Sequence, residues 1–168
     1  PVLTYTINGL TNGDTETIFT GTLSRTADEN VGTYTIGQGT LSAGNNYTTT
    51  YVGADFTITK ATLSIAADSM SKIYGTTDPT LTYTTNGLAN GDTESSIIGS
   101  LSRATGENIG TYAIGQGTLA AGGNYNISFT GADFNITKAP LNITADTKAK
   151  TYGTTDPALT YTISGLAN

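Results

Sequence analysis

The chain of 168 residues carries a formal net charge of −6, and charged residues occupy 12% of its positions, about half of the roughly 25% usual in globular proteins. The 7 basic residues are scattered, which excludes the clustered positive surface that nucleic acid requires. The sequence has no Cys and no His, which excludes disulfides, thiolate metal sites and the commonest general base, so we expect no enzyme and no catalytic residue.

The remaining composition favours a mainly β fold. Thr supplies 36 positions, alongside 21 Gly and 10 Tyr, and Thr and Tyr suit pleated, half-buried strands better than helices. The sequence contains no run of 18 apolar residues and no charged-then-apolar leader. We therefore expect no membrane contact by this fragment and place any export signal outside it.

The first predicted strand covers residues 3–7, where apolar and hydroxyl side chains alternate with a period of two, and it recurs at 81–85. Two Asn-Gly pairs follow within six residues and are strong turn signals. Asp14 is a residue type that favours a helix N-cap, so we expect one short helical turn at 15–20.

Three further strands are expected at 21–25, 32–37 and 47–59. Within the last of these, the apolar positions change from odd to even numbers. The change falls at Gly53-Ala54, and a β-bulge there would explain it.

The apolar positions change parity again beside Lys60, because Phe56 and Ile58 are even and Leu63 is odd. A slip of one residue sends side chains to the opposite face, so an extended segment with this slip can contribute to two different cores. We therefore expect a domain boundary near Lys60, and an equivalent one near Lys138, with almost no linker.

An internal repeat with a period of 78 residues covers the whole chain. Without a gap, 50 of the 78 positions in residues 1–78 are identical in residues 79–156, and the hexapeptide YGTTDP occurs in both periods. A unit of this length can bury a small core of its own. The expected domains are a partial repeat at 1–60 without its opening strand, a complete β repeat at 61–138, and the start of a third repeat at 139–168.

From Lys60 to Lys138 the chain carries the pattern KAxLxIxADxxxKxYGxxDPxLTYxxxGLxNGDT, followed by GxLSRxxGENxGTYxIxxGxL and FxITK. This pattern resembles the MBG and YDG type repeats of very large bacterial surface adhesins. The resemblance implies tandem β-rich modules, a location at the bacterial cell surface, and a stalk or adhesive role. It implies no known ligand and locates no site.

Four residues are candidates for a ligand surface or for a seam between repeats: Tyr74, Tyr152, Lys60 and Lys138. The two tyrosines lie outside any clean alternation, whereas Tyr5, Tyr34 and Tyr47 fall on the apolar parity of their strands and are expected in the core. The two lysines stand beside apolar neighbours, which suits a snorkelling side chain at a seam and also raises the alternative of an isopeptide cross-link.

Acidic residues provide the remaining candidate site. Asp68, Asp78, Asp92 and Glu94 carry the oxygen ligands that calcium prefers, but no EF-hand pattern is present. We expect no cofactor, with calcium as the weaker alternative, and we expect Asp78 to hydrogen-bond the backbone of its own turn. Arg25 with Glu29, and Arg103 with Glu107, are expected to form salt bridges.

The leading hypothesis is a non-catalytic, extracellular module in a stiff, elongated stalk, with neighbouring repeats as its partners. One alternative is a module that binds host or matrix glycans by avidity. The other is a filament subunit that associates with its own kind through unpaired strands. A β-grasp-like sheet and an immunoglobulin-like sandwich both accommodate the expected strands.

Overall fold

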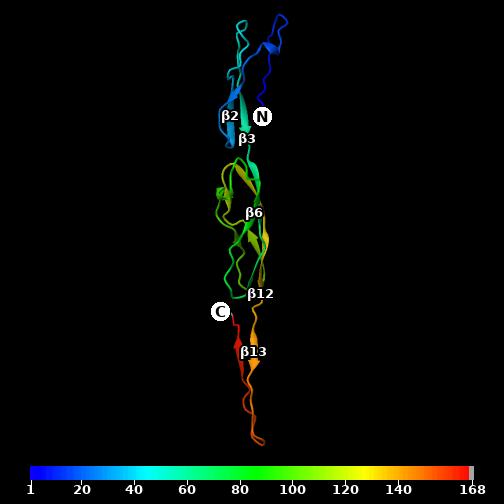
Figure 1. Cartoon of the computed structure of the whole chain (residues 1–168), viewed down its shortest axis with the longest axis vertical. Helices are drawn as coiled ribbons and strands as arrows, with labels where there is room; N and C mark the ends of the chain where they lie inside the picture. The colour runs from blue at the N-terminus through cyan, green and yellow to red at the C-terminus, as the bar shows by residue number, and fades with distance from the viewer. Residues whose placement is uncertain (167–168) are drawn as a thin grey trace. The chain divides into compact units, whose positions relative to one another are not determined.

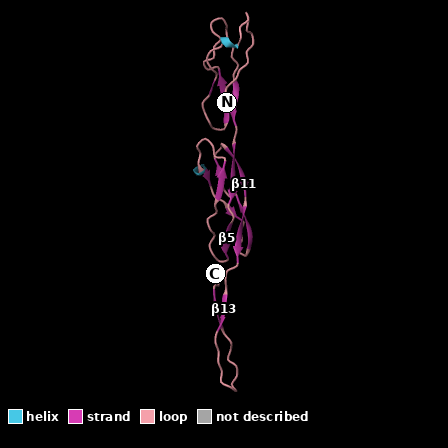
Figure 2. Ribbon diagram, turned by 45° about the vertical axis from the view of Figure 1, so that its right-hand side comes forward, coloured by secondary structure: helices cyan, strands magenta, loops and turns pink. Residues whose placement is uncertain are grey.

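Residues 1–166, which the computed structural model describes, form short strands and two 3-10 turns and contain no α-helix (Figure 2). The prediction of a mainly β fold is thereby confirmed. Among these residues no helix is long or apolar enough to cross a membrane. The chain divides into two compact units, Pro1–Ala61 and a second unit that begins at Thr62. The domain boundaries expected near residues 60 and 138 stay predictions.

One small antiparallel sheet forms the N-terminal unit (Figure 1). Its strands, in sheet order, are β1 (Ser24–Arg25), β2 (Gly32–Gly37) and β3 (Ala54–Ile58). The strand expected at 32–37 is confirmed to the residue. Residues 3–7 form no strand, and the expected strand at 47–59 is present only from Ala54 to Ile58.

The expected helical turn is present in both repeats as a 3-10 turn, η1 (Glu16–Ile18) and η2 (Glu94–Ser96). Thr15 occupies the N-cap position of η1 and makes no side-chain capping bond, so the expectation that Asp14 caps this turn is wrong. The Asp14 carboxylate instead accepts a hydrogen bond of 2.6 Å from the Tyr47 hydroxyl, which fastens the turn to a distant segment.

The central repeat, residues 61–138, contains nine strands: β4 (Ala61–Ala67), β5 (Met70–Ile73), β6 (Tyr83–Asn86), β7 (Ile97–Ile98), β8 (Ser102–Arg103), β9 (Gly110–Gly115), β10 (Ala120–Ala121), β11 (Tyr125–Thr130) and β12 (Ala132–Thr137). They form three sheets, in the orders β11-β4-β6, β5-β12-β9-β8 and β10-β7. The opening segment β4–β5 and the closing segment β11–β12 therefore each pass from one sheet to another.

This change of sheet explains the parity change that suggested a bulge. In the central repeat the equivalent of Gly53 is Gly131, which separates β11 from β12. A Cβ atom at Gly131 would lie 2.7 Å from the backbone oxygen of Ile114, a contact that only glycine avoids. The chain thus leaves one sheet and enters the next at this glycine, and no bulge within a continuous strand is needed.

Alternate residues of β9 and β12 build the core of the central repeat. Ile114, Phe134 and Ile136 are almost completely buried, and Met70 and Leu101 are among the half-buried side chains packed against them. In the other sheet, alternate residues of β4 are buried. The period-two alternation in the sequence therefore marks the buried faces of these strands correctly.

The third repeat begins with a hairpin of β13 (Asn142–Ala145) and β14 (Tyr161–Ser164). Its register repeats that of β4 with β6, because Ile143 lies opposite Ile163 as Ile65 lies opposite Thr85. The same sequence pattern thus produces the same pairing, although all residues of β13 are exposed and alternate residues of β4 are buried.

The segments at the positions of β6 and β11 differ between the repeats. In the central repeat β4 lies between β6 and β11. In the N-terminal unit, residues 5–8 and 47–52, at the positions of β6 and β11, form no strand. Tyr5 is exposed there, although its parity suggested a core residue.

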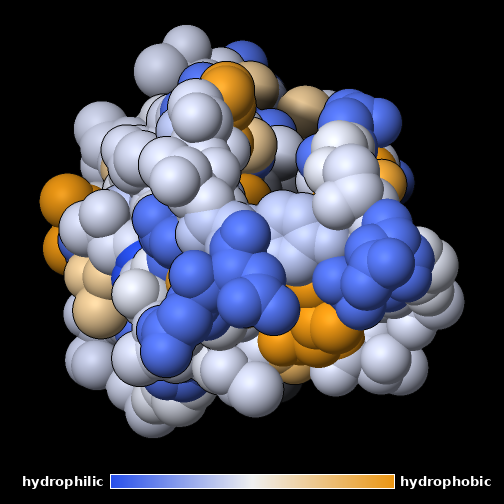
Figure 3. Space-filling view, turned by 90° about the horizontal axis from the view of Figure 1, so that it is seen from above, coloured by the Kyte–Doolittle hydropathy of each residue, from blue (hydrophilic) through white to orange (hydrophobic). Residues whose placement is uncertain are grey.

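The molecular surface is weakly polar. In Figure 3 most of the visible face is pale, with blue hydrophilic groups and a few separate orange areas. This appearance matches a chain that is rich in Thr and Gly and carries few charges. Charged side chains are therefore few, and those that pair with one another are the candidates for a site.

Candidate ion-pair cluster

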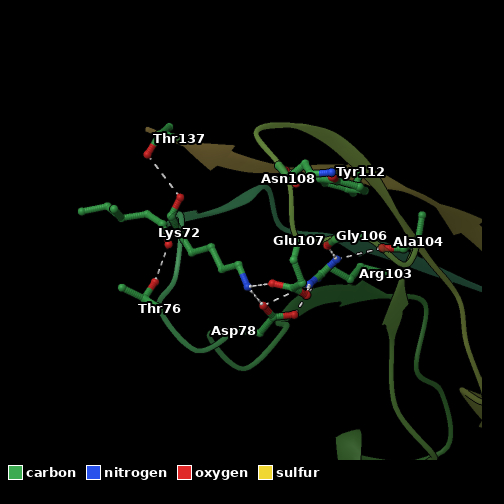
Figure 4. Close-up of polar contacts among 11 residues, drawn as sticks. Lys72, Thr76, Asp78, Arg103, Ala104, Gly106, Glu107, Asn108, Tyr112 and Thr137 are labelled. Carbon is green, nitrogen blue, oxygen red and sulfur yellow. Dashed lines mark hydrogen bonds and ion pairs between the residues drawn. The ribbon is translucent and has the colours of Figure 1, made fainter. Parts of the chain in front are cut away.

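Four charged side chains of the central repeat meet in one ion-pair cluster: Lys72, Asp78, Arg103 and Glu107 (Figure 4). Lys72 lies on β5 and Asp78 in the loop that follows it. Arg103 ends β8, and Glu107 lies in the loop before β9. The cluster therefore joins the opening segment of the repeat to the β8–β9 region, which lies up to 35 residues away along the chain.

The Asp78 carboxylate is the centre of the cluster. It accepts hydrogen bonds from Arg103 Nε at 2.6 Å and from Arg103 Nη2 at 3.2 Å, and Lys72 Nζ lies 2.6 Å from its Oδ1. Glu107 accepts from the same two cations and closes the ring (Figure 4). The side chains of Lys72 and Arg103 are 4% and 10% exposed, so both cations are withdrawn from water and depend on these carboxylates.

Aromatic rings and backbone carbonyls fix the position of Arg103. Its Cζ lies 4.8 Å from the centroid of the Phe134 ring and 5.5 Å from that of Tyr112. Its Nη1 donates to the carbonyl oxygens of Ala104 and Gly106, at 2.9 and 2.7 Å. The guanidinium is therefore held in one orientation, with its remaining N–H groups directed at Asp78 and Glu107.

Gly106 makes this arrangement sterically possible. Its φ of +146° lies outside the range that other residues favour, and a Cβ atom there would come within 2.3 Å of the Tyr112 ring. This backbone conformation therefore requires glycine, whereas in the N-terminal unit the equivalent residue, Asp28, presents its carbonyl to Arg25 at 2.6 Å without a positive φ.

The electrostatics of the cluster keep all four groups charged. The hydrogen bonds from Arg103, and then from Lys72, lower the pKa of Asp78 from 3.8 to about 2. The hydrogen bonds from Lys72 and Arg103 also lower the pKa of Glu107, and those from Asp78 and Glu107 raise the pKa of Lys72.

The other two repeats each contain one half of the cluster. Arg25 pairs with Glu29 in the N-terminal unit, and its Cζ lies 4.9 Å from the centroid of the Phe56 ring. Lys150 pairs with Asp156 in residues 139–166, where the two side chains are 46% and 81% exposed. The expected Arg–Glu pairs are thus confirmed, and the two halves meet only in the central repeat among the described residues.

The four residues proposed from the sequence as a ligand surface or seam lie outside the cluster. Tyr74 and Tyr152 are exposed, and Lys60 and Lys138 are exposed residues beyond the ends of β3 and β12. Within the described part of the chain, no hydrogen bond or ion pair joins the side chains of any two of them. Their role in a ligand surface or a seam stays a prediction.

The acidic residues considered for calcium are dispersed. Asp68 accepts a hydrogen bond from Thr82, Asp92 from the Tyr125 hydroxyl, and Glu94 from Thr85. Asp78 bonds Lys72 and Arg103, so the expectation of a bond to its own turn is replaced by these ion pairs. Within residues 1–166, no group of three or more His, Cys, Asp or Glu side chains could hold a metal ion.

The family model of the MBG domain (YGX type) matches residues 1–57, 63–135 and 141–168. The chain belongs to the MBG domain family. MBG domains are non-catalytic repeat modules typical of bacterial surface proteins. No curated protein and no solved structure is matched.

Acid is expected to destabilise the central MBG repeat, because the pKa of Asp78 in the folded repeat is about 2, below the value of 3.8 for an ordinary aspartate carboxyl group. A carboxylate whose pKa is lower in the folded than in the unfolded state stabilises the fold at pH values above its unfolded-state pKa. This contribution is lost as the pH falls through the folded-state pKa and the carboxylate becomes protonated. The thermal midpoint of the central repeat should therefore fall as the pH decreases from about 4 to about 2.

Asp78→Asn should make this acid dependence shallower when thermal unfolding is followed by circular dichroism at a series of pH values. Asp156→Asn is the matched control, because Asp156 has the same position in the third repeat and is largely exposed beside Lys150. It should leave the acid dependence unchanged. Equal effects of the two substitutions would contradict the role assigned to the cluster.

Proposed function

We propose that this chain is part of a stiff, non-catalytic stalk outside a bacterial cell, in which each MBG repeat resists being pulled apart. The observation that carries the proposal is the parallel pairing of β5 with β12, in which Met70 lies opposite Phe134 and Ile73 opposite Thr137. The occurrence of MBG domains in bacterial surface proteins supports the location.

The parallel register determines how a pulling force acts on the repeat. The chain enters the repeat before β5 and leaves it after β12, and both strands run in the same direction. A force applied to the two ends therefore slides one strand along the other, so that the hydrogen bonds between them bear the load together. An antiparallel pair pulled from one end would instead open one bond at a time.

The ion-pair cluster strengthens the same junction. Lys72 belongs to β5 and binds Asp78 and Glu107, while Arg103 binds both acids and lies against the Phe134 ring of β12. The Thr137 hydroxyl of β12 also donates to the Lys72 carbonyl oxygen at 3.2 Å. Side-chain contacts thus hold together the two strands that would have to slide.

Single-molecule force spectroscopy tests this proposal directly. The chain has no Cys, so pairs of introduced cysteines can serve as attachment points. Attachment at Thr62→Cys and Lys138→Cys loads β5 and β12 in shear, whereas Tyr74→Cys and Lys138→Cys pulls from one end of the same pair. We expect a clearly higher rupture force in the first geometry, followed by an extension of about 240 Å as residues 70–137 unravel.

Two outcomes decide the test. A shear force several times the peeling force supports a load-bearing repeat, and equal forces in the two geometries contradict it. The peeling variant is the matched control, because it contains the same strands and shares one attachment point.

Glycan recognition is the second candidate function. Tyr74 and Tyr152 stand at equivalent positions of two repeats, and both present exposed rings that could stack on sugars. We rank this role below the stalk, because neither ring lines either of the two hollows, of about 570 and 510 Å³, that the N-terminal unit contains.

A further inference from the structure

The Asn-Gly pair at residues 90 and 91 lies in the loop between β6 and η2 of the central repeat. The backbone N–H of Asp92 donates to the carbonyl oxygen of Ala89 at 3.0 Å and closes a turn around this pair. Asn90 and Gly91 have φ angles of +56° and +83°. This is the pattern of a type I′ turn, in which Asn followed by Gly is favoured because both central residues need a positive φ.

An asparagine side chain is chemically labile, and a following glycine leaves its backbone nitrogen the least hindered. That nitrogen can lose its proton to a base in the solvent and bond to the asparagine Cγ, while the Cγ–Nδ2 bond breaks and the amide group takes up a proton and leaves as ammonia. Water then opens the resulting cyclic imide at one of its two carbonyl groups. One product is aspartate. The other is isoaspartate, in which the main chain runs through Cβ and Cγ and is therefore one carbon longer.

Both reacting groups are accessible at Asn90-Gly91. The two residues are exposed, and within residues 1–166 neither the Asn90 side-chain amide nor the Gly91 N–H makes a hydrogen bond. No other atom lies within 4 Å of the position that a Cβ atom of Gly91 would occupy, so the glycine has open space beside it. Water and base therefore reach the atoms that have to react.

Tyr125, the first residue of β11, fastens this turn to the sheet. Its hydroxyl accepts a hydrogen bond from the Ala89 N–H at 2.9 Å and donates one to Asp92 Oδ2 at 2.7 Å. It therefore binds both residues that flank the Asn-Gly pair. Tyr125 is only 7% exposed, so an open turn would leave its hydroxyl buried without these partners, which is costly.

The same combination recurs in the N-terminal unit around Asn12-Gly13. There the Tyr47 hydroxyl accepts from the Thr11 N–H at 3.2 Å and donates to Asp14 Oδ2 at 2.6 Å. Asn12 also has a positive φ, of +57°. An exposed Asn-Gly turn held by a tyrosine hydroxyl is therefore a feature of the repeat and not of one loop.

The second Asn-Gly pair of the central repeat, Asn86-Gly87, is held by strand pairing. Asn86 is the last residue of β6 and lies opposite Ser64 of β4. A Cβ atom at Gly87 would lie 2.4 Å from the carbonyl oxygen of Thr62, so the backbone of this glycine packs directly against β4. Rearrangement at Asn86 therefore requires β6 to separate from β4, the central strand of its sheet.

We propose that Asn90 is a site of spontaneous conversion to isoaspartate and aspartate, and that the Tyr125 hydroxyl sets the rate by holding the turn closed. Ring closure requires rotation of the Asn90 backbone, which the bond between Ala89 and Asp92 restricts, so the reaction proceeds from the open turn. In isoaspartate the extra main-chain carbon separates Ala89 from Asp92, and one hydroxyl can no longer bind both. The conversion therefore releases the loop irreversibly. This inference is independent of the stalk proposal, which concerns β5 and β12.

Peptide mapping by mass spectrometry tests the proposal on the whole chain after incubation in mildly alkaline buffer. In the wild type, conversion at Asn90 should be faster than conversion at Asn86, and isoaspartyl and aspartyl products should both form. Tyr125→Phe keeps the ring and removes the hydroxyl. It should raise the ratio of Asn90 to Asn86 conversion roughly fivefold, the shift in an opening equilibrium that the loss of one ordinary hydrogen bond produces. Tyr112→Phe is the matched control, because it removes a hydroxyl that binds Asn108 in a different loop, and it should leave the ratio unchanged.

Amide hydrogen exchange tests the release of the loop. In the isolated isoaspartyl form, the amides of Ala89 and Asp92 should exchange faster than in the wild type, because each loses the acceptor that it has in the closed turn. Equal conversion at Asn90 and Asn86 in the wild type overturns the proposal. So does a ratio that Tyr125→Phe leaves unchanged or that Tyr112→Phe raises equally, or unchanged exchange of these amides in the isoaspartyl form.

Discussion

Phe134→Ala should lower the free energy of unfolding of the central repeat by about 3–5 kcal/mol, the usual cost of removing a fully buried aromatic ring. Phe134 is completely buried and packs in one core cluster with Ile114 and Ile136. Its ring also lies 4.8 Å from Arg103 Cζ, so its removal takes away one of the two rings that position the guanidinium. The substitution therefore damages the core and loosens the ion-pair cluster together.

Native-state hydrogen exchange of the β9 and β12 amides measures this loss, because it reports the central repeat separately from the N-terminal unit. Phe56→Ala is the matched control. Phe56 has the same position in the N-terminal unit and is only half-buried, so its replacement should destabilise that unit by clearly less. A loss below about 1 kcal/mol for Phe134→Ala would contradict the assigned core, because removing a ring from a well-packed site leaves a cavity and costs more free energy than this.

The alternation of apolar and polar residues predicts a strand correctly where the whole segment belongs to a single sheet. The segment at residues 32–37 shows this best, since its expected and observed bounds agree. The single strand expected at 47–59 is wrong, because the equivalent segment of the central repeat is two strands in two sheets that meet at Gly131. Period-two alternation reports which side chains share a face and contains no information about which sheet a strand joins.

The ion-pair cluster was only half predictable for a related reason. Arg103 and Glu107 are four residues apart, and their pairing followed from a hairpin. No local pattern marks Lys72 as a site residue, because its contact with Glu107 depends on the β5–β12 pairing and spans 35 residues. The one local signal was the recurrence of a Lys six residues before the Asp of YGTTDP, as Lys150 and Asp156.

The hexapeptide YGTTDP takes part both in the strand pairing and in the ion-pair cluster. Tyr74 donates its backbone N–H to the Thr137 carbonyl, so it extends the parallel pairing of β5 with β12. Asp78, at the other end of the hexapeptide, receives the hydrogen bonds of Arg103. The motif therefore connects the opening segment of the repeat to its closing strand and to its charged cluster.

Leu63→Ala should lower the free energy of unfolding of the central repeat by about 2–5 kcal/mol, since it removes a fully buried side chain from β4. β4 is the central strand of its sheet, between β6 and β11, so its hydrogen bonds support both of them. Weakening β4 should therefore loosen both of its neighbours, and exchange of the β6 and β11 amides should accelerate together.

Leu141→Ala is the control, because it makes the same change at the same position of the third repeat, where the side chain is half exposed. In dilute solution it should change stability by at most about 0.5 kcal/mol, as surface substitutions usually do. Faster exchange in β4 alone after Leu63→Ala, with β6 and β11 unchanged, would show that these strands do not depend on β4. Equal losses for Leu63→Ala and Leu141→Ala would show that position in the repeat, and not burial against neighbouring strands, determines the contribution of this leucine.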